Sequence, residues 1–139
     1  MGAMLQLVWL ESAPRGAPRH WYNLLCSVLE SPELGLKCCP HDPCIFHGCL
    51  IPGKPPIHVA IYADDIIFFS ASDEVEQYFQ SAFSAKLKVE FLGDAEWYIG
   101  IKFDWKKDDA GNVSCQLSQE GYAAPLWKKW VFLQLISLL

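Results

Sequence analysis

Two adjacent carboxylates interrupt the most strand-like part of the sequence, the stretch HVAIYADDIIFFS at residues 58–70. The flanking runs, IHVAI at 57–61 and IIFFS at 66–70, are short, β-branched or aromatic, and apolar almost throughout. Such runs are typical of strands that are buried on both faces. The pattern predicts a hairpin of two buried strands with Asp64 and Asp65 at the bend.

The aspartate pair is poorly explained as a turn former. Aspartate is common in turns, but a two-residue hairpin loop favours Asn-Gly or Asp-Gly, and YADD contains no glycine. Neighbouring carboxylates repel one another unless a cation neutralises them, and no Lys or Arg lies between Lys54 and Lys86. Mg²⁺ supplies such a charge and is held by one or two carboxylates plus substrate phosphates. The pair therefore indicates a platform for two-metal phosphoryl transfer.

Composition limits the class of protein. The chain has 139 residues, 52% of them hydrophobic, which predicts one domain, or a piece of one, with a real core. The formal net charge of −5 argues against a dedicated nucleic-acid-binding module. The N-terminus has no secretory pattern, so the six cysteines are expected to be free thiols in an intracellular protein of the cytoplasm or nucleus. The apolar run at 130–139 is too short to span a bilayer, so no membrane attachment is expected.

Periodicity predicts the other elements. Pro18 suits a first helical turn and Ser72 suits a helix N-cap. Alternation over 96–105 predicts a strand with Ile99, Ile101, Phe103 and Trp105 on one covered side. The expected elements are a helix at 20–30, a short strand at 44–47, strands at 57–61 and 66–70, a helix from Ser72, and strands at 96–105 and 113–119. This order predicts an α+β fold with an antiparallel sheet.

The hairpin sequence and four further blocks carry a family resemblance. Tyr-Ala-Asp-Asp between apolar strands resembles the catalytic hairpin of reverse transcriptases. The other blocks are similar, in the same order, to segments of copia-type LTR-retrotransposon polymerases. They are RGAPRHWYNLL at 15–25, HDPCIFHG at 41–48, FLGDAEWYIGIKF at 91–103 and LSQEGYAAPL at 117–126. By this resemblance residues 15–126 are part of a reverse-transcriptase palm, with two helices packed on one face of its antiparallel sheet, between unmatched segments at 1–14 and 127–139.

The resemblance implies an RNA-directed DNA polymerase with defined site residues. Asp64 and Asp65 would be the catalytic ligands of Mg²⁺ or Mn²⁺, which would not be bound tightly here. The expected partners of the intact parent enzyme are an RNA template, a DNA primer and a deoxynucleoside triphosphate; protein partners are unknown. The residues that would contact nucleic acid or nucleotide are Tyr62, Ala63, Arg19, Trp97, Tyr98 and Gly100.

The resemblance is incomplete at the N-terminal end. Two-metal polymerisation needs a third carboxylate from a neighbouring palm strand, and the only acid in residues 1–14 is Glu11. We therefore expect a truncated fragment that lacks the first catalytic strand and is inactive in isolation. The sheet would then have an open apolar edge, which is an aggregation hazard.

Two alternatives stay open at this point. CCPHDPCIFHGC at 38–49 has enough cysteine and histidine for a tetrahedral zinc site, but it lacks the paired Cys-x2-Cys spacing. The family comparison places Cys44 at a core position instead. The second alternative is a non-catalytic interaction protein derived from a retroelement.

Overall fold

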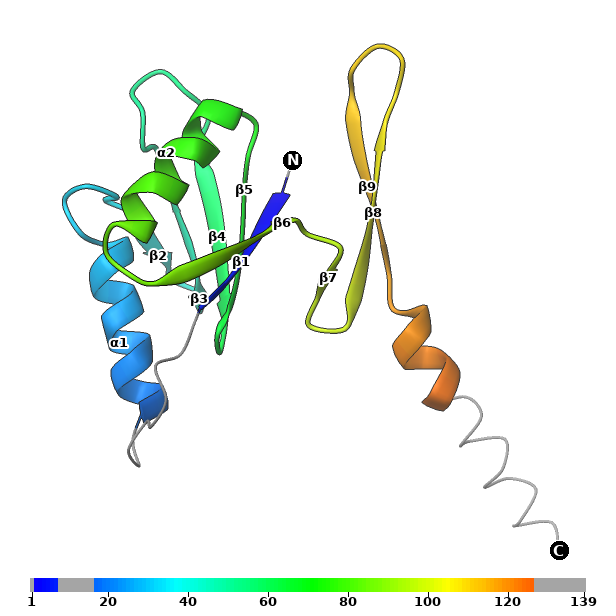
Figure 1. The fold of residues 1–139 in the computed structure, drawn as a ribbon, viewed down its shortest axis with the longest axis horizontal. Coiled ribbons are helices and arrows are strands. Elements are labelled where there is room, and N and C mark those ends of the chain that lie inside the picture. The colour runs from blue at the N-terminus through cyan, green and yellow to red at the C-terminus, as the bar shows by residue number, and fades with distance from the viewer. Residues whose placement is uncertain (1, 8–16, 127–139) are drawn as a thin grey trace, which may run out of the picture. The chain divides into compact units, whose positions relative to one another are not determined.

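The structure is a computed structural model that describes residues 2–7 and 17–126 (Figure 1). It consists of two units, Met1–Ala95 and Glu96–Leu139. Both units are built from antiparallel strands, and helices accompany them, so the fold is of the mixed α+β kind that the sequence predicts. Among the described residues, no helix combines the length and apolar character needed to cross a membrane.

The first unit contains a six-stranded sheet in the order β2-β3-β4-β5-β1-β6. All of its neighbouring strands are antiparallel. The strands are β1 (Gly2–Leu7), β2 (Lys37–Cys39), β3 (Asp42–Gly48), β4 (Ile57–Tyr62), β5 (Asp65–Ser70) and β6 (Val89–Asp94). The predicted strands at 44–47, 57–61 and 66–70 are confirmed as β3, β4 and β5. Neither the short β2 nor β6 was predicted as a strand.

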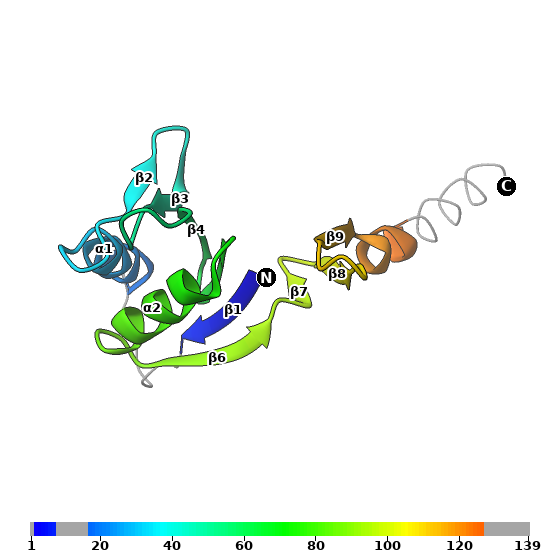
Figure 2. The same cartoon turned by 90° about the horizontal axis from the view of Figure 1, so that it is seen from above.

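Two helices cover one face of this sheet. They are α1 (Ala17–Leu29) and α2 (Asp73–Ser84). Pro18 lies in the first turn of α1, and Ser72 is the N-cap of α2 with an extended backbone, as predicted. Viewed from above, both helices lie on the same side of the curved sheet (Figure 2).

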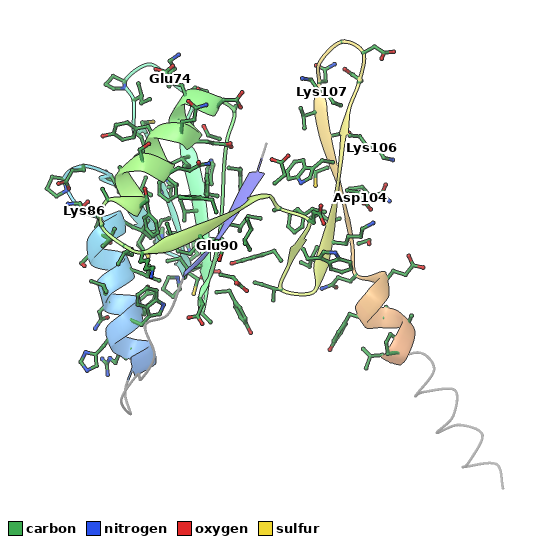
Figure 3. The ribbon with its side chains drawn as sticks, in the orientation of Figure 1. Glu74, Lys86, Glu90, Asp104, Lys106 and Lys107 are labelled. Atoms are coloured by element: carbon green, nitrogen blue, oxygen red, sulfur yellow. The ribbon has the colours of Figure 1, made fainter. Side chains whose placement is uncertain are left out.

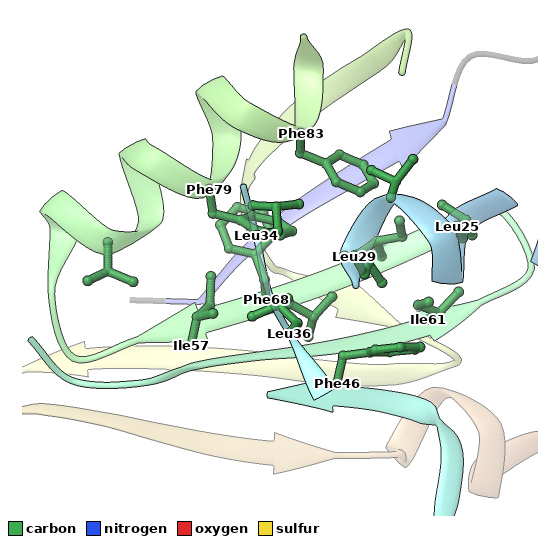
Figure 4. Close-up of a cluster of buried hydrophobic side chains, with 14 residues drawn as sticks. Leu25, Leu29, Leu34, Leu36, Phe46, Ile57, Ile61, Phe68, Phe79 and Phe83 are labelled. Atoms are coloured by element: carbon green, nitrogen blue, oxygen red, sulfur yellow. The ribbon is translucent and has the colours of Figure 1, made fainter. Parts of the chain in front are cut away.

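The core lies between the helices and the sheet (Figure 4). Its fully buried members come from both helices and from alternate positions of the strands, as a sheet with one covered face requires. They include Leu25, Leu29, Phe46, Ile57, Ile66, Phe68, Val75, Phe79 and Phe83. The intervening strand residues turn to the other side, which we call the outer face; it includes Ile45, His47, His58, Tyr62 and Phe69. Cys44 is exposed, so the core position that the resemblance implies for this cysteine is wrong. Phe46 is the buried residue of this strand.

Residues 2–7 form a strand at the place where the sequence analysis expects an open sheet edge. They form β1, which pairs with β5 on one side and with β6 on the other. The edge of β5 is therefore occupied, and the edge strands of this sheet are β2 and β6. This strand could not be predicted locally, because GAMLQL has no alternation that distinguishes a strand from a loop. Glu11, the only acid of residues 1–14, lies outside the described residues.

The second unit is a three-stranded sheet in the order β7-β8-β9, followed by helical residues 120–126. Its strands are β7 (Trp97–Tyr98), β8 (Ile101–Lys107) and β9 (Val113–Ser118). Ile99 and Gly100 both have positive φ, of 51° and 74°, and form the tight turn between β7 and β8. The predicted continuous strand at 96–105 is therefore two strands, and Ile99 belongs to a turn.

The predicted apolar side of this second sheet exists, and within this unit it is only partly buried. Phe103 pairs with Leu117, and Trp105 pairs with Cys115. The rings of Phe103 and Trp105 stack at 6.2 Å, while Leu117 is 59% exposed. Asp104 and Lys106 alternate with these residues along β8 (Figure 3).

A buried carboxylate joins α2 to β5 and makes stability depend on pH. Glu76 accepts a 2.9 Å hydrogen bond at Oε1 from the backbone N–H of Ser70 and is 8% exposed. Burial raises the pKa of Glu76 above its ordinary value, although the hydrogen bond from Ser70 opposes the shift. Because the pKa is higher in the folded state, the contribution of Glu76 to stability is greatest below its unfolded pKa and declines as pH rises through the folded pKa.

We expect Glu76→Gln to stabilise the protein at pH 7, since the amide keeps an acceptor for Ser70 without a buried charge. The gain should shrink towards pH 4, where the wild-type carboxyl is protonated. Urea unfolding at the two pH values measures it. Glu74→Gln, at an exposed position on the same helix, is the control. A gain that is equal at both pH values would contradict the assignment.

Candidate active site

The two aspartates lie at the tip of the β4–β5 hairpin. Tyr62 pairs with Asp65, so Ala63 and Asp64 form a two-residue loop. Ala63 has a φ of 51°, a value that L residues rarely adopt and that such loops require at their first position. Asp64 and Asp65 are half-buried, whereas Tyr62 is 56% exposed. The predicted hairpin is confirmed, and both carboxylates lie at its bend.

Helix α1 supports the hairpin from the helix-covered side. Trp21 Nε1 donates a 3.3 Å hydrogen bond to the carbonyl of Ala63. The next residue, Tyr22, donates a 2.7 Å hydrogen bond from its hydroxyl to the carbonyl of Pro43 on β3. Arg19 is exposed and lies two residues before Trp21 in the same helix. The structure thus brings the Ala-Pro-Arg-x-Trp-Tyr block to the end of the sheet where the aspartates lie.

The strand pairing adds two residues that the sequence analysis did not connect with the site. Gln6 on β1 lies directly opposite Asp65 and, on its other side, directly opposite Glu90 on β6. In the strand register, Asp65, Gln6 and Glu90 therefore occupy one cross-strand row. Glu90 is exposed and is labelled on β6 in Figure 3. Only the register joins these residues, because they are far apart in the sequence.

The carboxylate ligands at the hairpin tip suit one hard cation that a substrate also binds. Asp64 and Asp65 offer two carboxylates, which is the usual protein share of a Mg²⁺ site that also takes substrate phosphates. In the part of the chain that the structure describes, no three His, Cys, Asp or Glu side chains are grouped to hold a metal ion. The segment at 38–49 is described in full, and its cysteines and histidines form no such group in the structure.

The remaining predicted contact residues belong to the second unit. Trp97 and Tyr98 form β7, where Trp97 is 48% exposed and Tyr98 is buried. Gly100 occupies the turn with a φ of 74°. Together with the start of β8 these residues form a tight hairpin. Their nucleic-acid role remains a prediction.

Lys86 has a structural partner. Its Nζ lies 2.9 Å from Glu33 Oε1, an ion pair between the end of α2 and the loop after α1. Lys86 is labelled in Figure 3. The hydrogen bond from Lys86 lowers the pKa of Glu33 to about 2. This pair ties the loop after α1 to the end of α2.

Comparison with known proteins finds no significant similarity: no protein-family model, curated protein or solved structure matches the chain.

The strained loop residue gives a test of the hairpin geometry. A left-handed conformation costs a non-glycine residue about 1–2 kcal/mol, so Ala63→Gly is expected to raise the free energy of unfolding by about 0.5–1 kcal/mol after the entropy of glycine is subtracted. Urea unfolding measures the change. Ala60→Gly, within β4 and without positive φ, is the control and should destabilise. A destabilising Ala63→Gly would contradict the described turn.

Proposed function

We propose that the chain is part of the palm of a copia-type reverse transcriptase, which carries out RNA-templated DNA synthesis by two-metal nucleotidyl transfer. The observation that carries the proposal is the hydrogen bond from Trp21 to Ala63. It joins two sequence blocks that each resemble the family. Their spacing in the sequence does not by itself predict that they meet in the fold. The α+β architecture and the helices on one face of the sheet are compatible with a palm.

The proposed roles follow from position. Asp64 and Asp65 would hold the divalent cation, whose chemistry is to activate the primer hydroxyl and to stabilise charge on the transferred phosphoryl group. Tyr62, exposed on the outer face beside Asp65, would contact the template-primer. Ala63 offers a small side chain next to the primer terminus. Arg19, at the same end of the unit, would contact a phosphate.

We also propose that polymerisation by this chain alone is at background level. The position opposite Asp65 on the neighbouring strand is held by Gln6, which carries no charge. A two-metal site uses a carboxylate that bridges both ions, and an amide oxygen is a weaker ligand for a hard dication. A primer-extension assay on an RNA template with Mg²⁺ or Mn²⁺ measures this. Extension well above background that is lost in Asp64→Asn would contradict the proposed inactivity while supporting the polymerase ancestry.

Cation binding tests the site itself independently of turnover. Mn²⁺ is paramagnetic and broadens the NMR signals of nearby nuclei, so it should broaden amides of residues 62–66 at concentrations that spare the rest of β4 and β5. The double variant Asp64→Asn/Asp65→Asn should remove the effect. Asp73→Asn, an exposed acid in the first turn of α2, is the control. Broadening that is absent from the hairpin, or that survives the double variant, would count against the proposal.

A non-catalytic interaction protein is the second candidate. It is favoured by the exposed apolar side of the β8–β9 sheet, where Val113 and Leu117 are 46% and 59% exposed. Single exposed apolar residues are ordinary, but a contiguous apolar sheet face is typical of an interaction surface. This candidate predicts that Leu117→Lys removes partner binding and that Asp64→Asn leaves it unchanged.

A further inference from the structure

The outer face of the six-stranded sheet carries a cross-strand row that the proposed active site does not use. In the pairing register the row consists of Lys37, His47, His58 and Phe69 on β2, β3, β4 and β5. The strand neighbours Phe46 and Val59 are buried in the core, so by alternation His47 and His58 point away from the helices. His47 is exposed and His58 is half-buried.

The two imidazoles are held next to each other by the sheet. Their ring centroids lie 6.3 Å apart with an interplanar angle of 30°. Directly opposed residues of an antiparallel pair have Cβ atoms about 4.5–5.5 Å apart. Two nitrogens that share a zinc ion lie at most about 4 Å apart, because each Zn–N bond is about 2 Å. Rotation about the two side-chain torsions can supply this approach, so the backbone need not move.

Phe69, the fourth member of the row, restricts the second histidine. Phe69 stacks on His58 with centroids 5.2 Å apart and an angle of 21°. Phe69 lies on the strand beyond His58, on the side away from His47. The stack therefore limits rotation of the His58 ring away from its partner, which reduces the ordering cost of binding a ligand between the two rings. Lys37 is the charged member of the row and lies beyond His47.

From this geometry we infer a second metal site: His47 and His58 bind one divalent transition-metal ion, such as Zn²⁺, Ni²⁺ or Co²⁺, as a bidentate pair with water in the remaining positions. Imidazole suits these ions, whereas carboxylates suit Mg²⁺ and Mn²⁺. His58 precedes Tyr62 by four residues on β4, so the site is about 13 Å from the hairpin tip. It differs from a four-ligand zinc module because one ligand comes from segment 38–49 and the other from the next strand.

Metal titration of the full chain under reducing conditions tests the inference. Ni²⁺ affinity is measured by equilibrium dialysis for the wild type, His47→Ala and His58→Ala. Because two tethered ligands bind about 100-fold or more tightly than one, each substitution should reduce affinity by about that factor, and the double variant should lose little more. His41→Ala and His20→Ala remove the other two histidines, both exposed, and should leave affinity unchanged.

Two further measurements distinguish binding by the imidazole pair from an effect of ring packing and from binding by cysteine. His58→Phe keeps an aromatic ring against Phe69 and removes the ligand nitrogens, so it should lose affinity as His58→Ala does; retained affinity would overturn the inference. Co²⁺ bound by thiolates absorbs strongly in the near ultraviolet, whereas Co²⁺ bound by imidazoles does not. A thiolate band that persists in His47→Ala would assign the metal to the free cysteines and overturn the inference.

Discussion

Replacing Phe68 by alanine is expected to lower the free energy of unfolding of the first unit by about 3–5 kcal/mol. Phe68 is completely buried on β5, and its ring centroid lies 4.9 Å from that of Phe79 on α2. The substitution removes apolar area from the core and leaves a cavity between sheet and helix, where neither element can collapse freely. Hydrogen exchange of amides in β4, β5 and α2 measures the effect within this unit, and protection should fall about 100-fold or more.

Phe69→Ala is the matched control, because it makes the same chemical change at the next residue of the same strand. Phe69 is 48% exposed on the outer face and stacks on His58. Its loss should cost about 1 kcal/mol, mostly from that aromatic contact. Equal losses of protection for the two variants would contradict the described orientation of β5, because a shift of register by one residue exchanges the two faces.

Gln6→Asp is expected to raise the affinity of the hairpin for Mn²⁺ more than tenfold. The new carboxylate would stand opposite Asp65 in the strand register, with Glu90 on its other side. One added charge at about 5 Å from a dication is worth roughly 1.7 kcal/mol even at the dielectric constant of water. Without metal the same variant should be less stable than the wild type, because like charges directly opposite one another repel.

Gln6→Asn isolates the charge, since asparagine has the shape of aspartate without its charge. Mn²⁺ titration followed by electron paramagnetic resonance should give this variant an affinity close to that of the wild type. Adding Asp64→Asn to Gln6→Asp should remove most of the gain. If Gln6→Asp and Gln6→Asn bound Mn²⁺ equally, the row of Asp65, Gln6 and Glu90 would not be part of a cation site.

Local chemistry allowed several elements to be predicted from the sequence. The runs at 57–61 and 66–70 have the composition of buried strands, and Ser72 precedes a helical apolar pattern, so β4, β5 and the start of α2 follow directly. The aspartates were predicted to lie at a bend because they separate these two apolar runs. The strand β7 and the turn at Ile99 and Gly100 were missed, since alternation continues through the turn and conceals it. The strands β1 and β6 were missed because their pairing, rather than their composition, defines them.

The sequence by itself determined the paired carboxylates, the apolar strands that carry them and the amphipathic helices, because these depend on residue type and on spacings of a few positions. Only the tertiary structure decided that β1 fills the edge beside β5, that Gln6 stands opposite Asp65, and that His47 meets His58. The physical reason is that strand register is set by packing between distant segments: a shift of one residue exchanges the faces of a sheet, and no local propensity encodes which residues then become neighbours.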